Sequence, residues 1–507
     1  MGKFLKKIGE FFSGRIFWTG LLIAVQIVWG VALFLRLLTY SVWLDAALTA
    51  LSMVILLLII AGDENPAYKI SWMLVVGVLP LFGGLLYLLV GNKRYAFRIR
   101  HPLDQMRQRT APLLRQEETV AAQLQAADPR VAGTARYLAE RGGFPLYAHT
   151  ETRYYPIGEE LYAAMLEALE EAQSFIFLEY FIIAEGEMWD GILDVLRRKA
   201  AQGVDVRVMY DDMGSLNLVP TRYPKQLAKW GIRCQKFNPF VPVVSVVMNN
   251  RDHRKLLIID GHTAFSGGVN LGDEYINKTS RYGHWKDTGF RLRGEAVWSD
   301  TVMFLEMWNA FCPTDDDLER FRPTVAFESD GYVQPFGDSP LDDEPTSETL
   351  YIDLLSQATD YVYIYTPYLA ISNEMQTALC TAAKRGVDVR MVTPGTPDGK
   401  VVGRLTRSYY RPLLSAGVHI YEYTPGFLHA KSYLCDDKLA VVGTINMDFR
   451  SLYLHFECGT LFVGSSVVAS LKADVLDTLS RCTEITQKTR RRSMLLDAIL
   501  RMIAPLM

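Results

Sequence analysis

The chain has 507 residues, half of which are apolar, and this length predicts roughly two to four domains. Its formal net charge is −3. Proteins that bind nucleic acid usually have an excess of basic residues, so we expect no nucleic-acid partner. Its six cysteines are scattered and form no CxxC pair, which predicts reduced thiols rather than a disulfide framework or a zinc site.

Three apolar stretches open the chain, from Ile16 to Leu35, Ala46 to Gly62 and Ile70 to Asn92. A helix needs about 20 apolar residues to cross a bilayer, so the first and third are long enough and the second is borderline. A cleaved signal peptide is a poor fit, because the apolar region is too long and continues into further stretches. Residues 1–100 are therefore predicted to form a membrane anchor with two or three transmembrane helices.

Basic residues on both sides of this region bear on its orientation. Positive loops stay cytoplasmic, so the cluster after the third stretch predicts a cytoplasmic location for the large domain. The basic residues before the first stretch favour a cytoplasmic N-terminus as well. Three spans would put the two ends of the region on opposite sides of the membrane, so both basic clusters cannot then be cytoplasmic. The number of spans and the position of the N-terminus stay open. The two clusters are Lys93, Arg94, Arg98 and Arg100, and Lys3, Lys6, Lys7 and Arg15.

Residues 101–145 are charged and rich in Ala, Gln and Leu, which predicts a linking helix. A first α/β stretch follows in residues 146–325. Leu161, Met165 and Leu169 recur at helical spacing, residues 175–178 form an apolar strand pattern, and a second helix is expected over 192–200. The string Gly-Val-Asp-Val-Arg at 203–207 then closes the helix and starts a strand.

Residues 326–484 repeat this order. Leu350, Leu354 and Leu355 mark a helix face, Tyr361 to Tyr365 is strand-like, and a further helix runs to Lys384. Gly-Val-Asp-Val-Arg then recurs at 386–390. Strand, helix and strand in this order predict βαβ-type units, and the repetition predicts two similar halves.

Each half contains one copy of the pattern H-x-K-x4-D-x6-G-x-x-N. The first copy runs from His253 to Asn270 and the second from His429 to Asn446. Each histidine stands two residues before a lysine at the start of an apolar strand, so both side chains lie on one face of it. Two such halves facing each other would surround a phosphodiester with imidazoles, ammonium groups and amides, which neutralise and orient its oxygens.

This doubled motif resembles the paired HKD motif of the phospholipase D superfamily, and the resemblance covers about Tyr147 to Arg481. It implies two phospholipase D-like α/β halves packed as a pseudo-dimer, preceded by N-terminal transmembrane helices. It also implies a phosphohistidine intermediate, with His253 as nucleophile and His429 as general acid and base; the two roles could be exchanged. The candidate site comprises His253, Lys255, Asp260, His429, Lys431 and Asp436, with phosphate-binding roles for Lys255, Asn270, Lys431 and Asn446.

The carboxylates of the site fall into two groups. We expect the motif residues Asp260 and Asp436 at strand ends, away from the phosphate. Members of the family use other carboxylates to orient the histidines, and Asp287 and Glu457 stand about 30 residues past their histidines, where similar enzymes place this acid. A surface salt bridge is the competing interpretation for both. The other histidines (His101, His149, His262, His284, His419 and His455) show no metal-ligand spacing, so we expect no metal and no cofactor.

Further segments resemble bacterial cardiolipin synthases, namely 65–72, 80–87, 268–275, 366–369 and 446–451. The resemblance implies a phosphatidyl transfer between two phosphatidylglycerol molecules that gives cardiolipin and glycerol, at the bacterial plasma membrane and with the bilayer as a partner. The sequence does not indicate an oligomeric state. Within residues 485–507, the basic run Lys488 to Arg492 precedes an amphipathic stretch that suits an anionic membrane surface or a helix packed on the catalytic domain.

Three alternatives remain open at this point. A membrane phospholipase D would use the same motifs with water as acceptor, giving phosphatidic acid. A related synthase could use phosphatidylethanolamine as donor or make phosphatidylserine. A catalytically inactive membrane scaffold is disfavoured because both motifs are intact, and a nuclease is disfavoured by the acidic pI and the apolar stretches.

Overall fold

The computed structural model describes residues 42–62, 64–78, 83–84, 86–91, 97–240, 249–486 and 494–506, with isolated positions at 24, 25, 28, 29 and 32. The chain forms two compact units. The first comprises Met1–Ile99, Asn238–Asn250 and Met502–Met507, and the second comprises Arg100–Phe237 and Arg251–Arg501.

The first unit is built on α3 (Val42–Ala61), α4 (Pro66–Val78) and the π-helical turn η1 (Tyr87–Gly91). Trp72 and Tyr87 pack edge to face at the centre of its small core, with ring centroids 5.4 Å apart. The end of the chain belongs to this unit too. The Ser71 hydroxyl donates to the carbonyl of Met502 (2.5 Å), and Leu506 of η8 (Ala504–Leu506) packs on the core.

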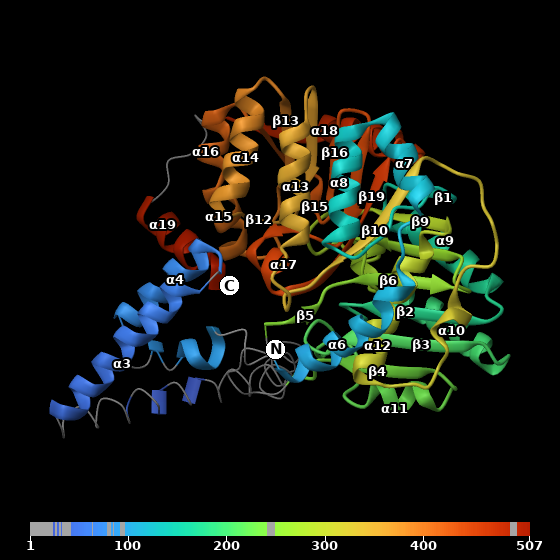
Figure 1. Cartoon of the computed structure of the whole chain (residues 1–507), viewed down its shortest axis with the longest axis horizontal. Coiled ribbons are helices and arrows are strands. Elements are labelled where there is room, and N and C mark those ends of the chain that lie inside the picture. The colour runs from blue at the N-terminus through green and yellow to red at the C-terminus, as the bar shows by residue number, and fades with distance from the viewer. Residues whose placement is uncertain are drawn as a thin grey trace, which may run out of the picture. The chain divides into compact units, whose positions relative to one another are not determined.

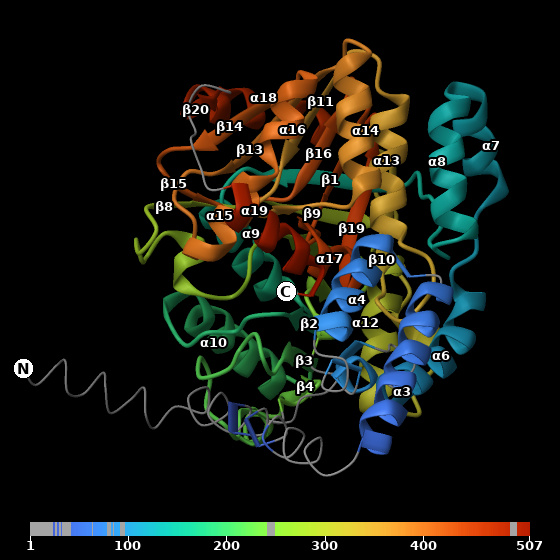
Figure 2. The ribbon, with the colours of Figure 1, turned by 90° about the vertical axis from the view of Figure 1, so that its left-hand side faces the viewer.

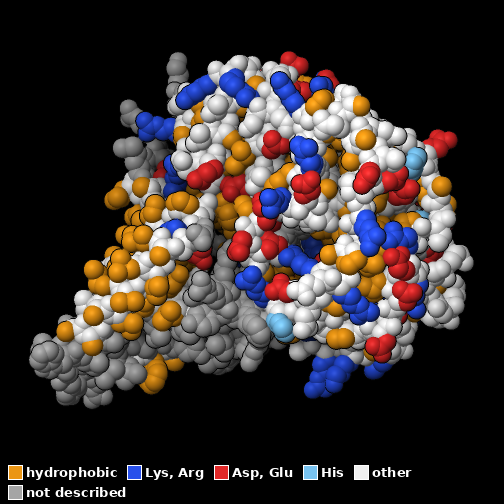
Figure 3. All heavy atoms as spheres, viewed as in Figure 1, with side chains coloured by type: hydrophobic (Ala, Val, Ile, Leu, Met, Phe, Trp, Pro, Cys, Tyr) orange, Lys and Arg blue, Asp and Glu red, His pale blue; other side chains and the backbone are white. Residues whose placement is uncertain are grey.

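The predicted membrane stretches fall on this unit. The stretch 46–62 coincides with α3 up to Ala61. The stretch 70–92 includes most of α4 and all of η1, and its residues 79–82, 85 and 92 lie outside the described residues, as does almost all of 16–35. Apolar side chains gather on the surface of α3 and α4 (Figure 3), among them Leu51, Val54, Leu57, Leu58, Leu74 and Val78. Within the described ranges, no helix is both long and apolar enough to cross a membrane.

The second unit contains two mixed sheets, the first drawn largely in green and the second in orange to red (Figure 1). In spatial order, the first sheet is β1 (Thr150–Tyr155), β9 (Gly289–Gly294), β7 (Thr263–Gly267), β6 (Lys255–Ile259), β2 (Phe175–Tyr180), β3 (Asp205–Asp211) and β4 (Arg233–Phe237). The second sheet is β10 (Tyr332–Asp338), β19 (His455–Val463), β17 (Leu439–Gly443), β16 (Ser432–Cys435), β11 (Tyr361–Tyr365), β13 (Asp388–Pro394), β14 (His419–Tyr423) and β20 (Cys482–Ile485).

The two sheets repeat one topology. In each, four antiparallel pairings are followed by two parallel ones, β2–β3–β4 in the first and β11–β13–β14 in the second. The predicted duplication of an α/β half is therefore confirmed, and β20 is an addition to the second copy.

Helices cover the sheets as the apolar periodicity predicts. In the first half they are α9 (Gly158–Glu171), α10 (Glu187–Ala201), α11 (Tyr223–Ala228) and α12 (Val297–Phe311), with the short turns η5 (Asp273–Ile276) and η6 (Leu318–Phe321). In the second half they are α13 (Thr346–Gln357), α14 (Asn373–Lys384), α15 (Lys400–Ser408), α16 (Tyr410–Ala416), α17 (Phe449–Tyr453) and α18 (Ser466–Ser480). Figure 2 shows α13 and α14 side by side over the second sheet.

The linking region is three helices rather than one. They are α6 (Phe97–Thr110), α7 (Glu118–Ala127) and α8 (Pro129–Glu140), with the turn η3 (Ala111–Leu113) after α6. Asp128 breaks the predicted helix because its carboxylate accepts the backbone N–H groups of Arg130 and Val131, which caps α8 behind Pro129. Thr134 of α8 then donates to Asp353 of α13 (2.6 Å).

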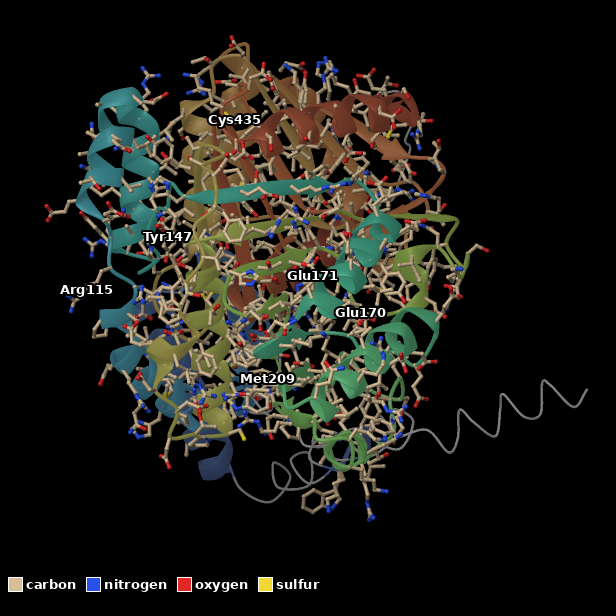
Figure 4. All side chains as sticks on the ribbon, turned by 90° about the vertical axis from the view of Figure 1, so that its right-hand side faces the viewer. Arg115, Tyr147, Glu170, Glu171, Met209 and Cys435 are labelled. Carbon is tan, nitrogen blue, oxygen red and sulfur yellow. The ribbon has the colours of Figure 1, made fainter. Side chains whose placement is uncertain are left out.

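All six cysteines are free thiols, in agreement with their scattered spacing. Figure 4 shows one of them, Cys435, at the end of β16 in the second half. The same view shows Glu170 and Glu171 closing α9, where Glu170 pairs with Arg198 of α10.

Candidate active site

The two motifs lie at equivalent places in the two sheets. His253 stands between the short strand β5 (Arg251–Asp252) and β6, and His429 stands between β15 (Gly426–Leu428) and β16. Both histidines are 6% exposed, and the lysines two residues later are buried. Arg254 points away from His253 and Lys255, as strand alternation requires, and pairs with Glu179 (2.8 Å).

Strands that cross between the halves complete the site. β5 of the first half pairs with β19 of the second, and β15 of the second half pairs with β8 (His284–Lys286) of the first. Both pairings are parallel, so each motif histidine is brought next to a carboxylate of the opposite half. His253 Nδ1 lies 2.9 Å from both oxygens of Glu457, and His429 Nδ1 lies 2.6 Å from Asp287 Oδ2.

These carboxylates determine which ring nitrogen is available. A carboxylate accepts a hydrogen bond, so Nδ1 carries the proton and Nε2 keeps a lone pair in the neutral ring. Glu457 is held by the hydroxyls of Thr444 and Ser451, and Asp287 by the backbone N–H of Thr288 (2.9 Å). With Nδ1–H facing its carboxylate, each histidine offers Nε2 as the nucleophilic or basic atom. At His429 the ammonium of Lys431 also lies 2.8 Å from Nδ1 and competes with Asp287 for that nitrogen.

Burial and neighbouring charges set the ionisation of the site. Burial, with the charges of Lys255 and Lys431, holds the pKa of His253 well below its ordinary value. Burial and Lys431 lower the pKa of His429 to about 4 against the opposing effect of Asp287. Burial also lowers the pKa of Lys255 to about 8 and that of Lys431 to about 7. At neutral pH both imidazoles are thus neutral, Lys255 is mostly cationic, and Lys431 is close to half protonated.

Asn270 and Asn446 are not equivalent. The Asn270 carbonyl accepts the backbone N–H of Ile182 (3.1 Å), and its amide donates to the Tyr275 hydroxyl (2.8 Å). Asn446 is also buried, but its carbonyl oxygen has no hydrogen-bond partner among the described residues. Asn270 is thus engaged in holding the surrounding loops, whereas Asn446 keeps a free polar atom.

Asp260 and Asp436 lie at the far ends of β6 and β16 from the motif histidines. Asp260 accepts the backbone N–H groups of residues 173–175, and Asp436 those of 359–361, at distances of 2.7–3.0 Å. Both have positive φ angles of about 50° at the turns that follow these strands. Each aspartate therefore holds the start of a strand of its own half, β2 or β11, through backbone hydrogen bonds. Neither aspartate contacts a motif histidine.

Aromatic side chains that the motif does not contain surround both histidines. Trp285, Tyr275 and Phe427 lie around His429, with ring centroids 5.3, 5.7 and 5.9 Å away. Phe181 and His455 lie beside His253, at 5.0 and 5.4 Å. A signal for Trp285 and His455 was present in the sequence, because each stands two residues before an orienting carboxylate, the spacing of side chains on one side of an extended chain.

One group of side chains among the described residues has the composition of a metal site. It comprises His253, His455 and Glu457, whose ligand atoms lie within 4.8 Å of one another. Glu457 already accepts from His253, Thr444 and Ser451, and the charges of Lys255 and Lys431 act on His253. This positive surrounding opposes a cation and favours an anion.

Comparison with known proteins agrees with this geometry. A family described as "Cardiolipin synthase, PLD-like domain" matches residues 165–280 and 351–477, and one described as "Phospholipase_D-nuclease N-terminal" matches residues 50–92. A crystal structure of phosphatidylserine synthase from Haemophilus influenzae shares the fold, with a TM-score of 0.54 at 14% identity over 74% of this chain and 98% of that one.

Relatives in other bacteria extend over most of the chain. A Streptococcus mutans protein described as uncharacterized is 44% identical and covers 86% of this chain and 96% of its own length. A Geobacillus cardiolipin synthase is 35% identical over 88% and 90% of the two chains, and cardiolipin synthase 2 of Bacillus cereus is 34% identical over 88% of both. The chain belongs to the cardiolipin synthase family of phospholipase D-like enzymes.

Proposed function

We propose that this protein is a cardiolipin synthase that transfers a phosphatidyl group from one phosphatidylglycerol to another and releases glycerol. The observation that carries the proposal is the crossed pair of histidine–carboxylate contacts, His253 with Glu457 and His429 with Asp287. Two imidazoles with available Nε2 atoms beside two buried lysines suit a displacement at a phosphodiester that proceeds through a covalent intermediate.

In the first step, His253 Nε2 forms a bond to phosphorus while the bond from phosphorus to the glycerol oxygen breaks. The leaving glycerol oxygen takes a proton from His429 Nε2. In the second step, the primary hydroxyl of a second phosphatidylglycerol gives its proton to His429 and bonds to phosphorus, and the phosphorus–nitrogen bond breaks. Two phosphatidylglycerol molecules thus yield one cardiolipin and one glycerol, and both histidines regain their starting states.

The charges of the site suit this order of events. A neutral His253 is the form that can attack, and its lowered pKa keeps it neutral. His429 has to carry a second proton, on Nε2, when the donor lipid binds. An anionic phosphodiester next to His429 favours that form, because an opposite charge stabilises the imidazolium. Lys255 and Lys431 then offset the charge that develops on the phosphoryl oxygens.

We further propose that the enzyme works at the bacterial plasma membrane. Residues 1–100 would form the anchor, 101–145 the linking region, 146–325 and 326–484 the two halves, and 485–507 a C-terminal membrane-surface segment. The apolar surface of α3 and α4 supports contact with lipid. The predicted basic run, Lys488 to Arg492, lies outside the described residues.

The C-terminal helix α19 (Met494–Ile503) has features of both roles expected for it. In the second unit its Asp497 pairs with Arg404 of α15 (2.8 Å), and Arg501 lies over the Tyr409 ring (4.5 Å). It also exposes Leu495, Leu496 and Ile499, which suits an apolar or interfacial environment.

The test is a product assay with the full-length protein in mild detergent and phosphatidylglycerol as the lipid, read by mass spectrometry. Cardiolipin with an equal amount of glycerol is the expected result. Phosphatidic acid without cardiolipin would identify water as the acceptor and overturn the synthase proposal. Product only after addition of phosphatidylethanolamine would identify a different donor.

A further inference from the structure

The two halves place different side chains at one equivalent position of the site. This position is two residues before the orienting carboxylate, at the spacing that puts two side chains on one side of an extended chain. It is Trp285 before Asp287 in the first half and His455 before Glu457 in the second. Trp285 packs on His429 with centroids 5.3 Å apart, and His455 packs on His253 at 5.4 Å. The repeat thus puts an indole beside one motif histidine and an imidazole beside the other. The indole Nε1–H of Trp285 is also buried without a partner among the described residues, but it can only donate, whereas the imidazole of His455 can donate and accept.

The polar atoms of His455 are buried and unused. The side chain is 7% exposed, and neither ring nitrogen has a hydrogen-bond partner within the described part of the chain. Glu457 Oε1 is 3.7 Å from His455 Nδ1, which is too long for a hydrogen bond. The Glu457 carboxylate is already occupied by His253, Thr444 and Ser451. A buried polar ring without partners is costly unless a ligand or water satisfies it.

The chemistry of this ring differs from that of its cationic neighbours. Burial lowers the pKa of His455 to about 3 despite the opposing effect of Glu457, so the ring is neutral at physiological pH. A neutral imidazole offers one donor and one acceptor, whereas the lysine ammonium groups only donate. The lysines therefore suit phosphate oxygens. The neutral imidazole of His455 suits a hydroxyl group, because each of them can both donate and accept a hydrogen bond.

We propose that His455 is a positioning residue that binds a hydroxyl of the glycerol headgroup of the acceptor lipid, next to the hydroxyl that attacks phosphorus. The inference rests on the proposed function, since His253 would carry the phosphoryl group. His455 lies beside His253, so a headgroup hydroxyl held there stays near the reacting phosphorus. The site would then prefer acceptors with two neighbouring hydroxyls over simple alcohols.

The experiment compares two soluble acceptors with phosphatidylglycerol as donor. Deuterated glycerol enters phosphatidylglycerol by exchange, and 1-propanol gives phosphatidylpropanol; both are measured by mass spectrometry over a range of acceptor concentrations. The variants are His455→Phe, which keeps a ring without polar atoms, and His455→Gln, which keeps a donor and an acceptor. The control is His419→Gln, which removes a histidine with a 51% exposed side chain.

We expect His455→Phe to lose about tenfold in kcat/KM for glycerol, chiefly through a raised KM, because one hydrogen bond to the acceptor is lost. Its phosphatidylpropanol formation should stay within about threefold of wild type, and His455→Gln should recover most of the preference for glycerol. His419→Gln should match wild type.

Equal losses with glycerol and propanol in His455→Phe, or an unchanged ratio, would overturn the proposal. Thermal unfolding checks the fold of each variant. If His455→Phe does not fold, His455→Leu takes its place and must shift the glycerol-to-propanol ratio in the same direction. Wild-type protein that makes phosphatidylpropanol but no cardiolipin would refute the proposed function. The ratio with free glycerol would still test His455 in that case.

Discussion

The contact between a carboxylate and Nδ1 of each motif histidine decides which atom reacts. Glu457 binds His253 with both oxygens at 2.9 Å and is fixed by two hydroxyls, whereas Asp287 binds His429 through one oxygen at 2.6 Å. The neighbouring positive charges hold the pKa of Asp287 below its usual range although burial opposes this. Asp287 is therefore an ionised acceptor, and the contacts of both carboxylates with Nδ1 favour the Nδ1–H tautomer.

Replacing Glu457 by Gln tests this role. A glutamine amide can donate to Nδ1 and so stabilise the wrong tautomer, in which Nε2 carries the proton and is not nucleophilic. We expect cardiolipin formation to fall by about 10²- to 10⁴-fold, measured as initial rates with phosphatidylglycerol. The matched control is Glu484→Gln, since Glu484 pairs with the exposed His419 at the same 2.9 Å distance. A loss of similar size in both variants would contradict the assignment.

The lysines make activity sensitive to alkaline pH. Burial and the charge of Lys255 lower the pKa of Lys431 to about 7, so Lys431 loses its positive charge as the pH rises through that value. Phosphate binding weakens accordingly, and kcat/KM should fall between about pH 7 and pH 9. In Lys431→Arg the guanidinium stays charged, so the remaining activity should fall only at higher pH, near the pKa of about 8 of Lys255.

The control for this profile is Lys438→Arg, at a lysine whose side chain is 66% exposed. It should keep the wild-type pH dependence. An alkaline limb that does not move in Lys431→Arg would exclude Lys431 as the group that titrates.

At the scale of residues, the sequence predicted which residue types form the site better than it predicted which of them contact each other. The strand period places His253 with Lys255 and His429 with Lys431, and in the structure each lysine ammonium donates to the backbone carbonyl of its own motif histidine. Spacing along the chain could not show that Glu457 contacts the histidine of the other half, because that contact depends on pairing between β5 and β19, which brings together residues 204 positions apart. The one signal for His455 in the sequence is its place two residues before Glu457, and that signal has meaning only once Glu457 is known to contact a motif histidine.

At the scale of elements, the repeated string Gly-Val-Asp-Val-Arg illustrates what local sequence determines. Gly203 and Gly386 have φ angles of +92° and +98° after α10 and α14, which suits glycine at a helix end, and the strands β3 and β13 follow. The arginines of the two strings then differ. Arg207 is fully buried and pairs with Asp205 and Asp316, whereas Arg390 is 32% exposed and pairs with Asp388. The surrounding fold, not the string, sets this difference.

The motif aspartates belong to this scale too. Asp436 accepts three backbone N–H groups at the start of β11, so Asp436→Asn, which tolerates the same backbone angles, removes acceptors without straining the turn. We expect the free energy of unfolding to fall by about 1–3 kcal/mol, measured by denaturant titration, while kcat stays near wild type.

The control is Asp437→Asn at the next position, whose 58% exposed carboxylate pairs with Lys472 and should contribute less than about 1 kcal/mol. A folded Asp436→Asn protein without activity would assign this residue to the chemistry instead.

At the scale of the whole molecule, the repeat makes one site from two incomplete ones. Each half supplies a histidine and a lysine, and each lacks the carboxylate that orients its own histidine. Further contacts cross between the halves, such as Lys286 of β8 with Asp474 of α18 (2.6 Å). The architecture was predictable from the duplicated pattern, whereas the crossing strands were not, because β5, β8 and β15 have only two or three residues each. Such short strands carry no periodicity that a sequence can show.

This construction leads to a prediction about mixing inactive variants. His253→Asn and His429→Asn should each be inactive, because a site without either histidine lacks the nucleophile or the acid. A mixture of the two purified variants should stay inactive as well, since both histidines of a site come from one chain within one compact unit. Cardiolipin formation is the measurement, and wild-type protein diluted into either variant serves as the positive control. Activity that appears on mixing would mean that halves exchange between chains, so that one subunit's β19 pairs with another's β5 and the crossed contacts form between molecules.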